Sequence, residues 1–166
     1  MPQTKTADLL ALLQARGLFL AVAESLTGGA LAAEIVSVPG ASNVFLGSIT
    51  AYQNSIKNNL LAVPANVLEV HGAVSAETAV AMARGVRDNF AKAAGIGVDQ
   101  VVGIATTGVA GPDADGDKPV GLVYLGFSLP GRGESSIELQ LTGDRSEIRA
   151  AAVQSALSEL GEQIAD

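Results

Sequence analysis

Hydroxyl groups and paired glycines stand together in the segment AESLTGG at residues 23–29, where a strand is expected to give way to a helix. Ligands of α/β sheets bind at the carboxyl ends of strands and at the amino ends of the helices that follow. Ser25 and Thr27 supply hydroxyls there, and Gly28 and Gly29 are expected to expose backbone N–H groups. A capped helix with a tight first turn would give the same pattern. The segment is not a Walker loop, because G-x-x-x-x-G-K-[ST] is missing.

Two further segments are expected at the same kind of position, at the carboxyl ends of strands in the predicted sheet. Tyr52 is expected at the end of a strand and Lys57 in the first turn of the next helix, where a solvated surface lysine is the alternative interpretation. Thr107 and Gly108 follow another strand and open a glycine- and aspartate-rich loop at residues 108–119. This stretch is either a plain connection or a binding loop, and its length favours function, because short loops are commoner in compact domains.

Three more residues are candidates for binding or catalysis. His71 precedes the expected start of a helix, where it either forms structural hydrogen bonds or acts as a base. Arg145 and Arg149 lie one helical turn apart at the start of the last helix, so they share a face. Such a pair would suit an anion, although ordinary surface arginines have the same spacing.

Composition excludes several classes of protein. The chain has 166 residues, with 10 Lys and Arg against 17 Asp and Glu and a net charge of -7, so nucleic acid is not expected as a partner. No apolar run is long enough to span a membrane, and the N-terminus lacks the pattern of a signal peptide, which predicts a cytoplasmic protein. With no Cys and 1 His, neither a metal site nor a disulfide is expected.

The pattern of apolar residues predicts one α/β domain over residues 1–166. The first helix carries an apolar stripe at Leu9–Leu13, with Thr4 or Thr6 as its cap. Further helices are expected near residues 30–36, 54–61 and 75–94 and from 144 onwards, with a turn at Pro64. Strands are expected near residues 18–23, 45–51, 101–106, 121–129 and 137–141. Alternating strands and helices followed by a hairpin favour a three-layer α/β/α sandwich around a mixed, five-stranded sheet.

Five motifs together resemble one family. AESLTGG, VPGASNVFLGSITAYQNSIK, HGAVS, TTGVAGPDADGDKPVG and GDRSEIR occur in the order and spacing of the CinA C-terminal domain family. The resemblance runs from about Ala21 to Leu160. It implies a mixed five-stranded α/β/α sandwich, in agreement with the strands expected above. It also implies an amidohydrolase, without metal or cofactor, that converts nicotinamide mononucleotide and water to nicotinic acid mononucleotide and ammonia.

The resemblance assigns roles to particular residues. It places the catalytic serine on Ser25, the tyrosine on Tyr52 and the lysine on Lys57, and it gives Thr107 and Arg145 further functional positions. A lysine kept neutral by burial can take the proton of a serine hydroxyl, and N–H groups of the glycine turn could stabilise the oxyanion. Tyr52 could relay the proton or hold the geometry.

The sequence departs from the family at two positions. Leu26 stands where many members carry Cys or another small residue, and Thr106 replaces a residue that is commonly aliphatic. The first change alters the edge of the expected pocket but leaves the serine hydroxyl in place, whereas the second adds a hydroxyl to which no use is assigned.

Other functions remain open. The chain could hydrolyse a different small amide, or it could be a catalytically silent, nucleotide-sensing or interaction module of competence and DNA-damage pathways. Joint presence of Ser25, Tyr52 and Lys57 favours an enzyme, because a binding module has no need of all three. The expected partner is a small molecule, nicotinamide mononucleotide, with neither nucleic acid nor a membrane, and the protein is expected to form a homo-oligomer of unspecified size.

Overall fold

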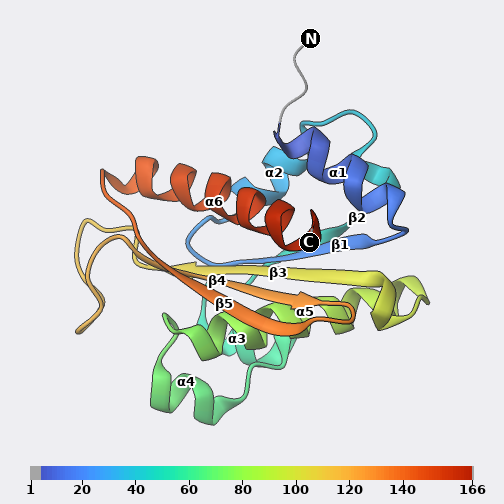
Figure 1. Cartoon of the computed structure of the whole chain (residues 1–166). Coiled ribbons are helices and arrows are strands. Elements are labelled where there is room, and N and C mark those ends of the chain that lie inside the picture. The colour runs from blue at the N-terminus through green and yellow to red at the C-terminus, as the bar shows by residue number, and fades with distance from the viewer. Residues whose placement is uncertain (1–4, 166) are drawn as a thin grey trace.

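A single mixed sheet forms the centre of the computed structural model, which describes residues 5–165 (Figure 1). The strands lie in the order β2-β1-β3-β4-β5. They are β1 (Phe19–Glu24), β2 (Phe45–Thr50), β3 (Val101–Gly108), β4 (Leu122–Leu129) and β5 (Gly133–Gln140). The first three run parallel to one another, whereas β4 and β5 continue the sheet as an antiparallel hairpin. The predicted mixed, five-stranded sheet is confirmed.

Helices cover both faces of this sheet. In Figure 1, α1 (Lys5–Ala15), α2 (Ala30–Val36) and α6 (Arg145–Ala165) lie above it. Below it lie α3 (Asn54–Leu61), α4 (Ala65–His71) and α5 (Ala76–Ala94). Two short 3₁₀ helices, Ala41–Asn43 and Val98–Gln100, precede β2 and β3. The three-layer arrangement is therefore also confirmed, and it produces a separate apolar cluster on each face of the sheet.

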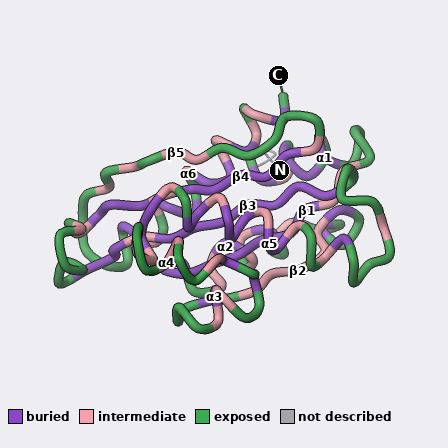
Figure 2. The backbone as a smooth tube through the Cα atoms, turned by 90° about the horizontal axis from the view of Figure 1, so that it is seen from below, coloured by how far each residue is buried: buried purple, intermediate pink, exposed green. Residues whose placement is uncertain are grey.

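Burial of the strands explains their composition. Strand β3 is buried along nearly its whole length, as the run through the middle of Figure 2 shows, and it is correspondingly a continuous stretch of small and apolar residues. Two glycines let α5 approach the sheet closely. A Cβ atom at Gly103 would lie 2.1 Å from the carbonyl oxygen of Ala83, and one at Gly126 would lie 2.0 Å from that of Ala79. Any larger residue at either position would push the helix off the sheet.

Helix capping was predicted correctly at two of three places. Ser75 accepts a hydrogen bond from the Thr78 N–H at 3.1 Å, and Asp144 and Glu147 form the expected capping box at the start of α6. The prediction of Thr6 as the cap of the first helix was wrong, since Thr6 lies inside α1, is buried and donates to Glu34. The alternative cap, Thr4, lies outside the described residues.

Two elements differ from the prediction. A turn was expected at Pro64, but the chain forms α4 directly after it. None of the α4 residues is fully buried, and only Val67 and Leu68 of this helix pack partly buried against the core, which is a short apolar signal in the sequence. Strand β5 begins at Gly133, earlier than expected. Its first half is hydrogen-bonded to β4 but is exposed and does not pack on the core, so the apolar pattern of the sequence did not include it.

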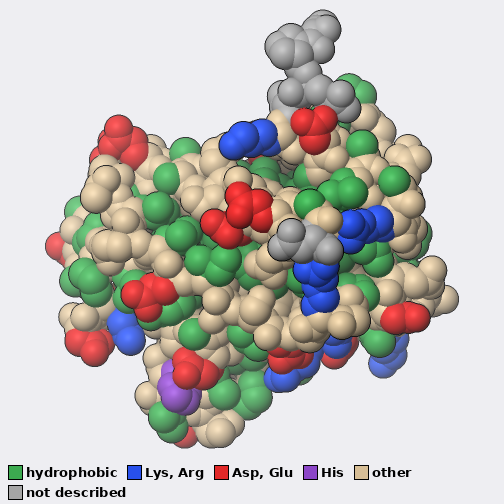
Figure 3. Space-filling view, viewed as in Figure 1, with side chains coloured by type: hydrophobic (Ala, Val, Ile, Leu, Met, Phe, Trp, Pro, Cys, Tyr) green, Lys and Arg blue, Asp and Glu red, His purple; other side chains and the backbone are tan. Residues whose placement is uncertain are grey.

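The charge distribution on the surface and the apolar character of the helices are relevant to possible partners. On the face in Figure 3, basic and acidic side chains are interspersed, and no basic patch gathers on it. Within residues 5–165, none of the helices combines the length and the apolar character that a membrane span requires.

Candidate active site

The carboxyl ends of the parallel strands carry all three segments singled out from the sequence. Glu24 at the end of β1 pairs with Thr50 of β2 on one side and with Thr106 of β3 on the other. This register brings the residues that follow β1, β2 and β3 to one edge of the sheet. A cavity of about 160 Å³ opens there. It is lined by Ser25, Leu26, Tyr52, Lys57, Ala73, Val74, Thr107, Gly108, Ala110, Asp115 and Arg145.

Lys57 is the most unusual residue of this cavity, because its side chain is only 1% exposed. Its Nζ lies 3.0 Å from the Oγ of Ser25, 2.9 Å from the carbonyl oxygen of Ala51 and 3.0 Å from that of Tyr52. No carboxylate is hydrogen-bonded to it among the described residues. Burial disfavours the charged ammonium and lowers the pKa of Lys57 from 10.5 to about 8.

The three neighbours of Nζ are not equivalent. The carbonyl oxygens of Ala51 and Tyr52 can only accept hydrogen bonds, whereas the Ser25 hydroxyl can donate as well as accept. A neutral amine has two N–H groups and one lone pair. When both N–H groups bind the carbonyls, the lone pair is left for Ser25, which then donates its proton to nitrogen. In the charged form Nζ donates to all three neighbours, and in the neutral form it can accept a hydrogen bond from the Ser25 hydroxyl alone.

A buried carboxylate closes the turn after Ser25. Glu24 is fully buried, and its Oε2 accepts hydrogen bonds from the N–H groups of Gly29 and Leu31, both at 3.0 Å. Its Oε1 accepts a third from Ala32 at 3.0 Å. Gly28, in turn, donates its N–H to the carbonyl of Ser25 at 3.1 Å.

The expectation that Gly28 and Gly29 expose free N–H groups was therefore wrong. Both residues have positive φ angles, 59° and 98°, so the tight turn itself was interpreted correctly. Neither lines the cavity. Within residues 5–165, the turn N–H groups that have no acceptor are those of Leu26 and Thr27.

The hydroxyl of Thr27 also points away from the cavity. Its Oγ1 lies 2.8 Å from the Oγ1 of Thr106, and both residues are fully buried. The added hydroxyl of Thr106 therefore has a partner, and this contact ties the turn after β1 to the end of β3. The structure places Thr27 in support of the turn, and not among the residues that line the cavity.

Thr107 and Gly108 line the cavity. Thr107 is buried and donates its hydroxyl to the carbonyl of Ala73 at 2.6 Å, which ties β3 to the segment before α5. A Cβ at Gly108 would lie 2.7 Å from the carbonyl oxygen of Leu122, so the close pairing of β3 with β4 requires glycine here.

Tyr52 and Arg145 form the mouth of the cavity. Tyr52 is 57% exposed, and its hydroxyl accepts a hydrogen bond from Nη2 of Arg145 at 3.3 Å. Nη1 of Arg145 donates to the carbonyl of Gly111 at 2.6 Å. Tyr52 thus holds Lys57 through its backbone carbonyl, whereas its ring faces the entrance. Its phenol is hydrogen-bonded to neither Ser25 nor Lys57, which disfavours the proton-relay role.

His71 lies outside the site. It forms the last residue of α4 and does not line the cavity; its Nδ1 lies 3.5 Å from a carboxylate oxygen of Glu77. The structure therefore does not bring the alternative base to Ser25. No group of three or more His, Asp or Glu side chains within the described part of the chain is placed to hold a metal ion.

Two charged residues of the site were not predicted from the sequence. Glu24 looked like an ordinary acidic residue at a strand end, although a carboxylate just before a glycine turn and a helix start is a signal for capping. Asp115 brings a carboxylate to the cavity from the loop after β3. The aspartates of that loop were visible, but nothing in their spacing distinguished Asp115 from its neighbours.

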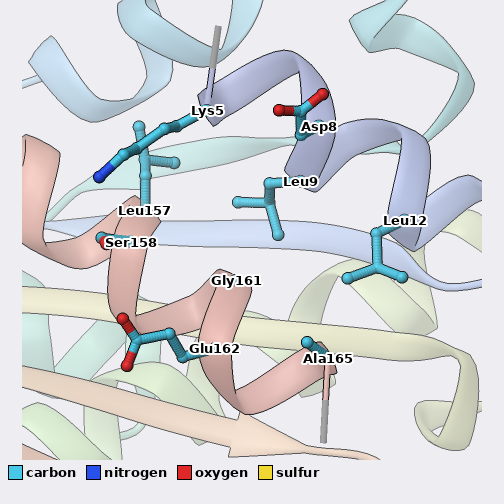
Figure 4. A pocket seen from close by; sticks show the side chains of 9 residues that line it. All are labelled: Lys5, Asp8, Leu9, Leu12, Leu157, Ser158, Gly161, Glu162 and Ala165. Atoms are coloured by element: carbon cyan, nitrogen blue, oxygen red, sulfur yellow. The ribbon is translucent and has the colours of Figure 1, made fainter.

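A larger hollow of about 360 Å³ lies between α1 and α6 (Figure 4). Leu9, Leu12 and Leu157 line it together with residues of mixed charge, among them Lys5 and Glu162. It shares no residue with the cavity at Ser25. Its lysine and serine, Lys5 and Ser158, differ from Ser25 and Lys57, because Lys5 is exposed, whereas Lys57 is buried.

Fold and site together define a class: an α/β protein whose parallel strand ends carry a serine paired with a buried lysine. Comparison with known proteins identifies the family. A family model described as the CinA C-terminal domain matches residues 3–164, and the chain belongs to that family.

Relatives and solved structures agree with this assignment. A CinA-like protein of Frankia casuarinae is 46% identical over 149 residues, which cover 90% of this chain and 32% of the relative. A CinA-like protein of Dictyoglomus thermophilum is 45% identical over 151 residues, with 90% and 34% covered. This chain thus spans about a third of the length of these relatives.

Among solved structures, a competence-damaged protein (CinA) superfamily protein from Klebsiella pneumoniae has a TM-score of 0.86 at 32% identity. The match covers 97% of this chain and 96% of that one. A competence/damage inducible protein from Agrobacterium tumefaciens also has a TM-score of 0.86, at 30% identity, with 98% and 94% covered.

Proposed function

We propose that the protein is a serine amidohydrolase that converts nicotinamide mononucleotide and water to nicotinic acid mononucleotide and ammonia. The observation that carries this proposal is the environment of Lys57, whose two carbonyl neighbours leave the lone pair of the neutral amine for Ser25. Family membership supports the choice of substrate, because the CinA C-terminal domain family that the sequence resembles includes nicotinamide mononucleotide deamidases.

The proposed reaction has two halves. Ser25 Oγ attacks the carboxamide carbon while its proton passes to Nζ of Lys57, which gives a tetrahedral intermediate. The C–N bond then breaks, and ammonia leaves with the proton from Lys57. Water attacks the resulting acyl-serine, Lys57 again accepts and returns a proton, and the carboxylic acid is released. The N–H group of Leu26, which lines the cavity and has no acceptor within the described chain, is the candidate to bind the oxyanion.

The side chains at the mouth of the cavity can bind the phosphate end of the nucleotide. At about 160 Å³ the cavity is smaller than the roughly 300–1,000 Å³ of sites that enclose a whole ligand, so only the carboxamide end enters it. Arg145 then offers its planar fork of donors to the phosphate outside. The carboxylate of Asp144 does not oppose this, because it caps α6 by accepting the N–H groups of Ser146 and Glu147. Asp115 supplies a negative charge for the pyridinium ring.

Ammonia release from nicotinamide mononucleotide by the wild type and Ser25→Ala, each with and without EDTA, tests this proposal. The wild type should release ammonia in both conditions, and Ser25→Ala should be slower by roughly three or more orders of magnitude. Activity of the variant within tenfold of the wild type would remove Ser25 from the mechanism. Loss of activity in EDTA would contradict the metal-independent reaction.

The same assay separates the remaining alternatives. A hydrolase of another small amide would release ammonia from a panel of carboxamides but not from nicotinamide mononucleotide. A silent nucleotide-sensing module would release none from any of them. The cytoplasmic location and the homo-oligomeric state stay predictions.

A further inference from the structure

Two arginines one helical turn apart on α6 make different contacts. Arg145 lies at the mouth of the cavity, as described above. Arg149 reaches the turn that carries Ser25 instead. Its Nε donates to the carbonyl of Leu26 at 2.9 Å, and its Nη2 donates to the carbonyl of Thr27 at 2.8 Å. The guanidinium therefore binds two successive peptide groups immediately after the serine and does not line the cavity.

These contacts fix the orientation of two peptide planes. In a trans peptide the C=O and the following N–H point in opposite directions. Because the Leu26 carbonyl faces Arg149, the Thr27 N–H must point away from the guanidinium. The Thr27 carbonyl also faces Arg149, and the N–H of Gly28 points back to the carbonyl of Ser25 at 3.1 Å. Arg149 thereby selects one of the conformations that a glycine-rich turn could otherwise adopt.

The turn is held between two layers of the fold. Helix α6 lies above the sheet and α3 lies below it (Figure 1). Arg149 therefore binds the turn from one side, and Lys57 of α3 contacts Ser25 from the other.

We propose that Arg149 is a positioning residue that holds the Ser25 hydroxyl in line with the Lys57 lone pair. This inference rests on the proposed serine mechanism. It also assigns different roles to Arg145 and Arg149. Arg145 binds Gly111 and Tyr52 at the mouth of the cavity, whereas Arg149 binds two carbonyls of the turn and acts on the serine through that turn. Displacement of a reacting group by about 1 Å can slow a reaction by roughly a hundredfold.

Labelling by diisopropyl fluorophosphate tests the inference without any assumption about the amide substrate. Ser25 Oγ forms a bond to phosphorus, the P–F bond breaks, fluoride leaves, and the serine proton passes to Lys57. Mass spectrometry gives the site and the rate of labelling. The comparison uses the wild type, Arg149→Met and Arg16→Met. Arg16 is a matched control, since it also donates to a backbone carbonyl, that of Ala165 at 3.0 Å, but Ala165 is the last residue of α6, at the opposite end of that helix from Arg149.

We expect the maximal labelling rate of Arg149→Met to fall about 10- to 100-fold, while Arg16→Met stays at the wild-type rate. The midpoint of the pH profile should stay where Lys57 sets it, because the lysine remains buried. General loss of structure would instead move that midpoint towards the ordinary pKa of lysine. If Arg149→Met does not fold, Arg149→Lys replaces it; a single ammonium lacks the two-point fork, so labelling should still slow.

Labelling of a folded Arg149 variant at the wild-type rate would overturn the positioning role and leave the serine mechanism intact. Failure of the wild type to label at Ser25 would overturn the serine mechanism and this inference together. The two failures are therefore distinguishable.

Discussion

The turn that carries Ser25 and the mouth of the same cavity are built in opposite ways. At the turn, the side chains of Glu24, Thr27 and Thr106 are fully buried, and each is hydrogen-bonded within the chain. At the mouth, Tyr52 is more than half exposed and meets Arg145 through one long hydrogen bond of 3.3 Å.

We expect the buried turn and the exposed mouth to have different roles. The buried turn is organised before any substrate arrives, which is what stabilisation of a transition state requires. The exposed mouth places charged and aromatic groups where they can meet the proposed substrate. Substitutions at the reacting pair should therefore act on kcat, those in the supporting turn on stability, and those at the mouth on KM.

The largest effect is expected at the reacting pair. Lys57→Met should lower kcat for nicotinamide mononucleotide by about 10²- to 10⁴-fold, because the variant keeps an apolar side chain of similar length but has no base. His71→Asn is the matched control and should stay close to the wild type, since His71 does not line the cavity. A greater loss in His71→Asn than in Lys57→Met would reverse the assignment of the base. Steady-state ammonia release measures both.

An intermediate effect is expected at the mouth. Arg145→Ala should raise KM for nicotinamide mononucleotide by about 10- to 100-fold, which corresponds to the roughly 1.5–3 kcal/mol of a hydrogen bond to a charged group. Nicotinamide riboside lacks the phosphate, and its KM should change far less. Equal losses on the two substrates would show that Arg145 supports the fold or the chemistry, and that the phosphate is bound elsewhere.

A smaller effect, on stability alone, is expected within the turn. Thr106→Val leaves the Thr27 hydroxyl buried without its partner, so the free energy of unfolding should fall by about 1–3 kcal/mol. In the double variant Thr27→Val/Thr106→Val no hydroxyl is left unpaired, and the loss should be less than the sum of the two single losses. Denaturant unfolding of all four proteins measures this coupling. Strict additivity would mean that the contact contributes nothing.

The sequence was sufficient for the fold because the strands are strongly patterned. Strand β3 is a buried apolar run, and the capping box at Asp144 marks the start of α6 unambiguously. Helix α4 escaped prediction because it buries none of its residues.

The site could be predicted only in part. The chemical types of Ser25 and Lys57 were visible in the sequence, as was the expected position of Ser25 after a strand and of Lys57 in the first turn of a helix. Their contact depends on β1 and β2 lying side by side in the parallel sheet. The sequence predicted that both residues lie at the same edge of the sheet, but it did not predict the distance between Ser25 Oγ and Lys57 Nζ. The direction of a backbone N–H group is not encoded in residue type, so the turn was expected to present Gly28 and Gly29, and instead those groups bind the chain itself.

In the proposed mechanism neutral Lys57 removes the proton of Ser25, and the pH dependence of kcat/KM for ammonia release shows whether it does. A base must be deprotonated to act, so kcat/KM should rise about tenfold per pH unit at low pH and level off as pH passes the Lys57 pKa of about 8. A rise that levels off near pH 6.5, the ordinary pKa of histidine, or a profile that is flat through pH 8 would contradict the account.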